Sequence, residues 1–161
     1  MATASATFDG QTFQANIPDP TEESLLQMGQ SALTREQILQ RIDQLEISAD
    51  AKLLLSRVST VVIQVGEVII SVGRRILEIA LFIAREFPMA GIGMVLGILI
   101  GALVGAIPIF GVVLGPLITP LAAAFGLLRG AFEDFKNKSL QHRIEEAVSQ
   151  FAPLKGEVHV A

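Results

Sequence analysis

The chain has 161 residues, a net charge of −4 and a pI near 5.1, so it lacks the basic surface that nucleic-acid binding requires. Hydrophobic residues make up 51% of it and charged residues 17%, below the ~25% of ordinary soluble domains, and the mean hydropathy is +0.55. With no cysteine, disulfides and thiolate chemistry are excluded. We expect one domain with a membrane-like middle, polar ends and no nucleic-acid partner.

Residues 1–18 are small, polar and weakly acidic, without a basic residue or an apolar stretch. Cleavable signal peptides need a basic start and an apolar stretch, and transit peptides are rich in arginine, so neither is predicted. We expect a flexible tail, which a partner could order through Phe8, Phe13 and Ile17.

Residues 19–47 carry two helix starts and predict two short amphipathic surface helices. Asp19 precedes a proline and has the position of an N-cap, and Gly29 has the position of a helix end. Thr34 and Gln37 have the spacing of a capping box at the start of the second helix. Its narrow apolar stripe needs a surface to lie against.

Residues 50–86 predict one long helix that is apolar on most of its surface. Its charges cost more in a bilayer than its apolar residues return, so it does not cross the membrane alone. The helix lies at the interface, packs on a membrane hairpin or turns its polar stripe toward an aqueous lumen. Arg74 and Glu78 are spaced to neutralise one another. The stripe consists of Arg57, Thr60, Gln64, Glu67, Ser71, Arg74, Glu78 and Arg85.

Residues 87–128 contain no charged residue or histidine. A membrane-crossing helix needs roughly 20 apolar residues, and Pro108 divides this segment into two arms of about that length. We therefore predict a hairpin of two transmembrane helices with its turn at Pro108. Pro116 and Pro120 predict a kinked second arm that is buried against protein.

Four glycines in the first arm recur at every fourth position, which places them on one ridge of a helix. Such glycine zippers let a second helix approach closely inside a membrane. The partner is either the second arm or another subunit. The ridge consists of Gly93, Gly97, Gly101 and Gly105.

Residues 129–152 have the pattern of a C-terminal amphipathic helix with an ion pair between Asp134 and Lys138, and residues 153–161 form a tail. The tail alternates in character and is suited to adding a strand to a partner. Basic residues flank the charge-free segment on both sides. By the positive-inside rule, both termini are expected on the cytoplasmic or equivalent side of a membrane.

No residue pattern indicates catalysis. His142 and His159 are the only histidines, and neither has a metal-ligand partner at a suitable spacing. The glycine-rich runs lack the Lys-Ser/Thr of a phosphate-binding loop. We expect no catalytic residue, metal, cofactor or small-molecule substrate, and no enzymatic activity.

Together these patterns predict an all-α, membrane-associated protein with a central hydrophobic hairpin flanked by amphipathic helices. We expect a lipid bilayer as partner and a non-enzymatic structural, anchoring or assembly component that self-associates through its glycines or joins a larger assembly. One alternative is a homo-oligomeric pore lined by the polar stripe, similar to holins and small channels. Another resembles the pore-forming toxins, in which a soluble effector hides its hairpin until it inserts.

Overall fold

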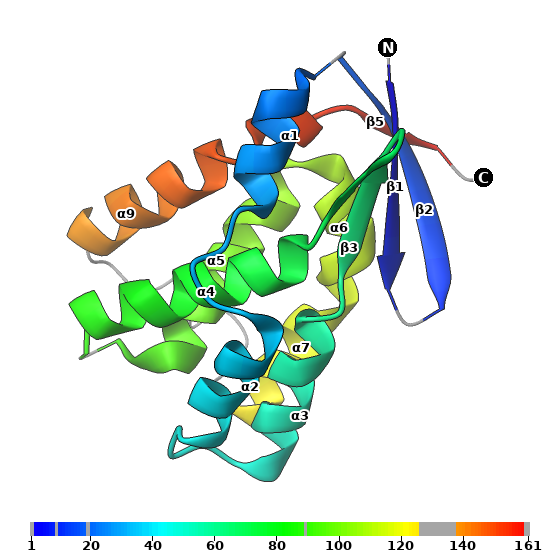
Figure 1. Cartoon of the computed structure of the whole chain (residues 1–161). Coiled ribbons are helices and arrows are strands. Elements are labelled where there is room, and N and C mark those ends of the chain that lie inside the picture. The colour runs from blue at the N-terminus through cyan, green and yellow to red at the C-terminus, as the bar shows by residue number, and fades with distance from the viewer. Residues whose placement is uncertain (1, 9, 19, 89, 126–137, 160–161) are drawn as a thin grey trace.

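The computed structural model describes residues 2–8, 10–18, 20–88, 90–125 and 138–159, with side chains up to residue 156. It is a mixed α/β structure in which a sheet lies beside a group of helices (Figure 1). In chain order the elements are β1 (Ala2–Phe8), β2 (Gln11–Ile17), α1 (Glu22–Gly29), α2 (Arg35–Asp43), α3 (Ala49–Val58), β3 (Val62–Val65), β4 (Val68–Ile70), α4 (Val72–Glu86), α5 (Gly91–Ala106), α6 (Pro108–Leu114), η1 (Gly115–Leu117), α7 (Ile118–Ala124), α9 (Lys138–Ser149), η2 (Ala152–Leu154) and β5 (Glu157–His159).

The sheet is antiparallel, with the strand order β4-β3-β1-β2-β5. Tight hairpins connect β1 to β2 and β3 to β4, and each turn has a glycine with positive φ, Gly10 at 79° and Gly66 at 61°. Glycine adopts this conformation without steric cost, and it matches the twist of the flanking strands. Ala4 and Ala15 are paired on the buried face, whereas Ser5 and Gln14 are paired on the opposite face.

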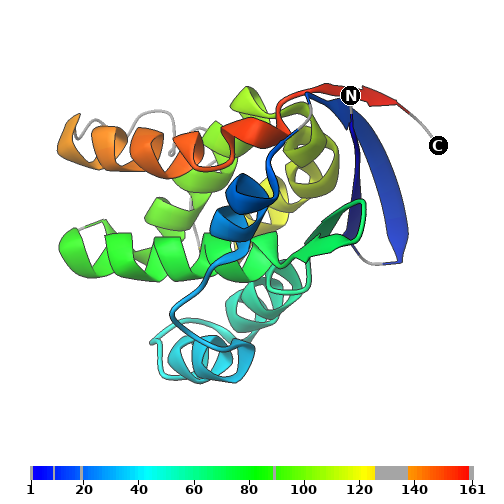
Figure 2. The same ribbon diagram turned by 45° about the horizontal axis from the view of Figure 1, so that its top comes forward.

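The helices cover one face of this sheet (Figure 2). α6 contacts β1, β2 and β5, while α5 packs against α4, α6, α7 and α9. Phe110 of α6 is fully buried and meets the ring of Phe151 edge to face, with 5.7 Å between centroids. α5 is therefore the central helix of the hydrophobic core.

The prediction of one long helix over residues 50–86 is wrong. α3 ends at Val58, and the β3–β4 hairpin occupies the middle of this range before α4 begins at Val72. Its run of valine and isoleucine favours strands because β-branched side chains pack well on a pleated surface. Because this range is divided among two helices and a hairpin, its polar residues do not form one continuous stripe.

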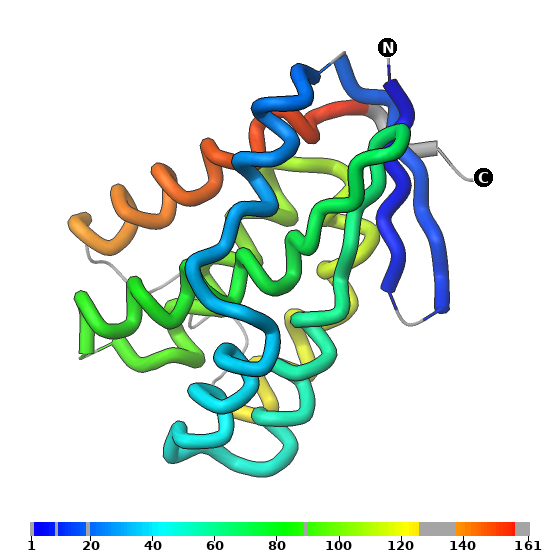
Figure 3. Tube along the Cα trace, viewed as in Figure 1, coloured from blue at the N-terminus to red at the C-terminus, as the bar shows by residue number. Residues whose placement is uncertain are grey.

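The prediction of two transmembrane helices over residues 87–128 is also wrong. Among the described residues, no helix combines the length and the apolar character needed to span a bilayer. α5 has 16 residues and α6 and α7 have 7 each, and the trace changes direction between them (Figure 3). This finding overturns the predicted membrane localisation and the placement of both termini on one side. The segment lacks charges because α5 and α6 supply much of the protein core.

The predicted all-α class and the predicted flexible N-terminal tail are wrong, whereas the C-terminal tail does form a strand, but within the chain rather than on a partner. Residues 1–18 contain β1 and β2, and β5 in the C-terminal tail pairs with β2 of the same chain. Of the C-terminal amphipathic helix predicted over residues 129–152, the structure describes α9, which is amphipathic and buries Leu140 and Ile144. Residues 129–137, which include Asp134 and its predicted pair with Lys138, lie outside the described part of the chain.

Candidate functional site

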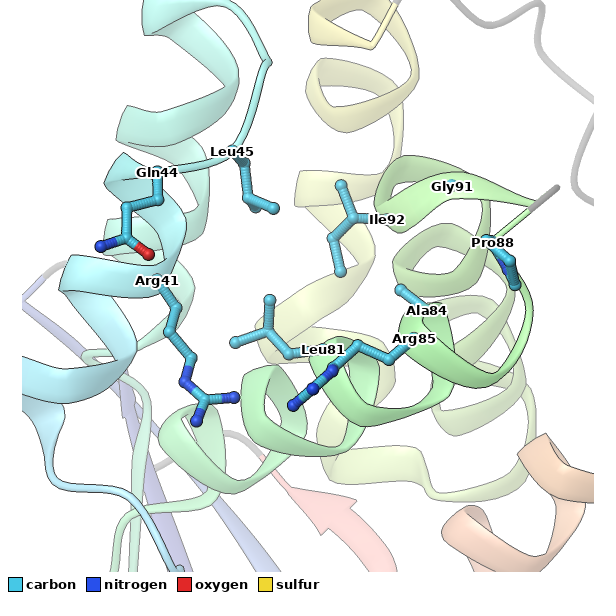
Figure 4. Close-up of a pocket in the computed structure, with 9 residues that line it drawn as sticks. All are labelled: Arg41, Gln44, Leu45, Leu81, Ala84, Arg85, Pro88, Gly91 and Ile92. Carbon is cyan, nitrogen blue, oxygen red and sulfur yellow. The ribbon is translucent and has the colours of Figure 1, made fainter.

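A groove lies between α2, α4 and the start of α5 (Figure 4). Its volume is about 470 Å³, within the ~300–1,000 Å³ typical of small-molecule sites. Most of its lining is apolar, and the polar side chains include two arginines. The lining residues are Arg41, Gln44, Leu45, Leu81, Ala84, Arg85, Pro88, Gly91 and Ile92.

The first wall of the groove is set by the start of α2. Thr34 is its N-cap: the Gln37 N–H donates to Thr34 Oγ1 at 3.2 Å, and the Thr34 N–H donates to Gln37 Oε1 at 2.9 Å. The predicted capping box is therefore confirmed. Ile38 and Ile42 are buried, which anchors the helix. Arg41 in the last turn of α2 and Leu45 four residues later, just beyond the helix, then line the groove together.

The second wall is the end of α4 and the turn that follows it. Leu81 and Arg85 are also four residues apart and share one face of α4. The chain then reverses into α5 at Gly91, whose φ of +75° is accessible to few residues other than glycine. This turn brings Ile92 opposite Leu45 (Figure 4).

The two ends of the groove differ in the charge of their side chains. The guanidinium groups of Arg41 and Arg85 point toward each other with Leu81 between them, whereas Leu45 and Ile92 face each other farther along (Figure 4). Arg41 is half-buried and Arg85 is exposed. One end is thus cationic and the other apolar.

Two carboxylates at the ends of the groove-forming helices pair with basic residues outside the groove. Asp43 lies 3.8 Å from Lys52, and Glu86 forms a two-point ion pair with Arg143 of α9. Within the described part of the chain, neither Arg41 nor Arg85 has a hydrogen bond or an ion pair. Two guanidiniums that face each other without a counter-ion favour the binding of an anion.

Glu78 of α4, one turn before Leu81, is 1% exposed and fully engaged in hydrogen bonds. Its carboxylate accepts from Arg75 Nη1 at 3.0 Å, from the backbone of the α1–α2 connection and from the Ser31 hydroxyl. The local partner predicted from the sequence was Arg74. In the structure Arg75 takes that place, because the i,i+3 geometry aims it at the carboxylate.

The predicted polar stripe is distributed over several elements. Arg57 lies on α3, Gln64 on β3, Glu67 in the β3–β4 turn and Ser71 at the N-cap of α4. Arg74, Glu78 and Arg85 lie on α4, and of the whole stripe Arg85 alone lines the groove. The sequence patterns did not single out Arg41 as a groove residue. Its four-residue spacing to Leu45 is the only feature of the sequence that links it to the groove lining.

The four glycines of the predicted ridge all lie on α5, but in different surroundings. Gly93 and Gly97 are buried, and a Cβ on Gly93 would lie 2.6 Å from the ring of Phe125. Gly101 and Gly105 are exposed, with open space where a Cβ would be. Whether this ridge mediates self-association stays a prediction.

The three prolines predicted as turn and kinks lie at breaks or within short helices. Pro108 is the first residue of α6, Pro116 lies in η1, and Pro120 lies in α7. Proline is well suited to a first helical position, where its missing N–H is not required. The three prolines divide the apolar segment into short helices that pack within one hydrophobic core.

His142 is exposed on α9 and lies 3.4 Å from Glu146, as an ordinary surface pair. The side chain of His159 lies outside the described part. Over the described ranges, no group of His, Cys, Asp and Glu is arranged to hold a metal ion.

No protein-family model, curated protein or solved structure is significantly similar to this chain.

Proposed function

We propose that the groove binds an anionic amphiphile, a molecule with a carboxylate or phosphate group on an apolar chain, and that the protein is a non-enzymatic binding module. The observation that carries this proposal is the pair Arg41 and Arg85, turned toward each other at one end of an otherwise apolar groove. The head group lies between the guanidiniums, and the chain runs between Leu45 and Ile92.

Charge and shape both support this ligand class. A guanidinium donates hydrogen bonds in a planar fork that matches carboxylate and phosphate oxygens. The apolar lining gains free energy by leaving water when an alkyl chain covers it. A purely ionic ligand would leave this lining exposed, and a neutral one would leave the two cations without a partner.

The proposal differs from the expectation of no small-molecule ligand but keeps the expectation of a non-enzymatic role. Within the described residues, the groove lining holds no nucleophile, carboxylate or histidine. Two arginines and a glutamine bind and orient a ligand, but they do not provide the acid–base pair that hydrolysis or group transfer requires.

Isothermal titration calorimetry with dodecanoate, dodecyl phosphate and dodecanol tests this proposal, with each probe used below its micellar concentration. Both anions should bind and dodecanol should bind much more weakly. Arg41→Gln and Arg85→Gln should each weaken anion binding by about 10- to 100-fold, which corresponds to ~1.5–3 kcal/mol for a hydrogen bond to a charged group. Stronger binding of one anion would identify the head group.

Arg35→Gln is the matched control, because Arg35 is an exposed arginine on the same helix that does not line the groove. It should leave the affinity unchanged. Equal losses from Arg35→Gln and Arg41→Gln would mean that only net charge matters. Association with phosphatidylglycerol vesicles without binding of either soluble anion would place the contact at a lipid surface and contradict a groove site.

A further inference from the structure

The connection between α1 and α2 is held against α4 by hydrogen bonds to one buried carboxylate, that of Glu78. Glu78 Oε1 accepts from the Ala32 N–H at 3.2 Å, and Oε2 accepts from the Leu33 N–H at 3.3 Å and from the Ser31 hydroxyl. The Glu78 side chain is almost inaccessible to water. Each donor and acceptor in this cluster is therefore costly to leave without its partner.

The carboxylate is itself held in place from a second direction. Arg75 donates from Nη1 to Glu78 at 3.0 Å and from Nη2 to the Gln150 side chain at 3.0 Å, just after α9. Arg75 supplies the positive charge that a buried carboxylate requires. The connection is thus bound to a fixed group on α4 rather than to a mobile surface side chain.

This cluster and the groove share both of their supporting helices. Leu33 is followed directly by Thr34, the N-cap of α2, and α2 carries Arg41. On α4, Leu81 of the groove lies three residues after Glu78, with Arg85 one turn farther along. Over such short distances a helix moves as a unit. The place where Leu33 is held against α4 therefore sets the position of Arg41 relative to Arg85.

We infer that Glu78 is a positioning residue for the groove: by holding residues 31–33 on α4, it fixes the separation of the two guanidiniums that bind the anion. This inference rests on the proposed function. Coupling between two sites is reciprocal. A ligand that bridges Arg41 and Arg85 therefore stabilises the hydrogen bonds from Ala32 and Leu33 to Glu78.

Glu78→Gln tests the inference because two explanations predict opposite signs. If Glu78 positions α2, the variant should bind dodecanoate about tenfold more weakly, a change within the range of coupling between sites. If Glu78 acts only through its charge, removing a negative group should strengthen the binding of an anion. Unchanged or tighter binding in a folded variant overturns the inference.

Two further variants separate positioning from loss of stability. Ser31→Ala keeps the buried charge and removes one donor, so it should weaken binding less than Glu78→Gln does. Ile17→Val alters a buried residue of β2, away from the groove, and should lower the melting temperature while leaving the affinity unchanged. Weakening in proportion to melting temperature across all three would overturn the inference.

Amide hydrogen exchange supplies a readout independent of affinity. Saturating dodecanoate should slow exchange at Ala32 and Leu33 in the wild-type chain, and this protection should be lost in Glu78→Gln. Absence of binding by the wild type would refute the proposed function itself. Wild-type binding without protection at these two amides would refute only the positioning role.

Discussion

Gly73, at the first turn of α4, lies directly against the carbonyl oxygen of Val58 at the end of α3. Its N–H donates to the carbonyl of Val61 at 3.0 Å, and a Cβ added at this position would also lie 3.0 Å from the Val61 nitrogen. The two helices on either side of the β3–β4 hairpin therefore meet through backbone atoms, where no side chain fits.

Gly73→Ala should destabilise the fold by about 2–3 kcal/mol, as expected when a well-packed site is overfilled. The neighbouring atoms belong to the backbone and cannot move aside by a change of rotamer. Chemical denaturation followed by circular dichroism measures the effect. A variant as stable as the wild type would show that α3 and α4 do not approach each other in this way.

Gly101→Ala is the matched substitution on α5 and should have the opposite effect. A Cβ at this exposed position meets no atom within 4 Å, and alanine favours a helix over glycine by ~0.5–1 kcal/mol. The melting temperature should rise. A fall, together with a smaller mass by native mass spectrometry, would instead reveal a self-association interface along the glycine ridge.

Gly105→Lys tests whether this face of the last turn of α5 is open to solvent. Gly105 is exposed near the end of α5, where a cation is compatible with the helix dipole. The change in stability should stay within about 0.5 kcal/mol in detergent-free buffer. A loss of several kcal/mol, measured by thermal melting, would show that a side chain at this position is buried without a partner and would contradict the fold.

The apolar end of the groove makes a separate prediction about chain length. Each methylene that becomes buried contributes about 0.8 kcal/mol, which corresponds to about fourfold in affinity. A series of alkanoates from hexanoate upward should therefore bind progressively more tightly until the groove is filled, and then reach a plateau. Ile92→Asn should flatten this dependence while leaving hexanoate unaffected. An affinity independent of chain length would show that the tail stays in water.

Local signals predicted several parts of this fold that depend on neighbouring residues, although the N-cap of α1 is Thr21 and not Asp19. The capping box of Thr34 and Gln37 and the end of α1 at Gly29 both follow from one turn of helix. The hairpins had local signals too, since Asp9-Gly10 and Gly66-Glu67 separate runs of strand-forming residues. In residues 1–18 the small, polar composition instead indicated a flexible tail, and in residues 50–86 the apolar periodicity indicated a helix.

Two other features could not be read from local patterns. A core helix and a membrane helix can have the same composition, and α5 differs chiefly in its length and in the helices packed around it. The groove brings Arg41 and Arg85 together from helices separated by α3 and a β-hairpin, so no spacing motif marks the pair.

The strand order also constrains when the sheet can be completed during synthesis. Asn16 of β2 pairs with Glu157 of β5, so one partner of β2 leaves the ribosome only after helices α1 to α9 of the described ranges have been made. Until then β2 presents unpaired N–H and C=O groups along one side, a template for pairing with another chain. Pairing across so long a stretch of sequence is intrinsically slow. Newly made chains are therefore most exposed to aggregation before β5 arrives, when the helical core can already have formed.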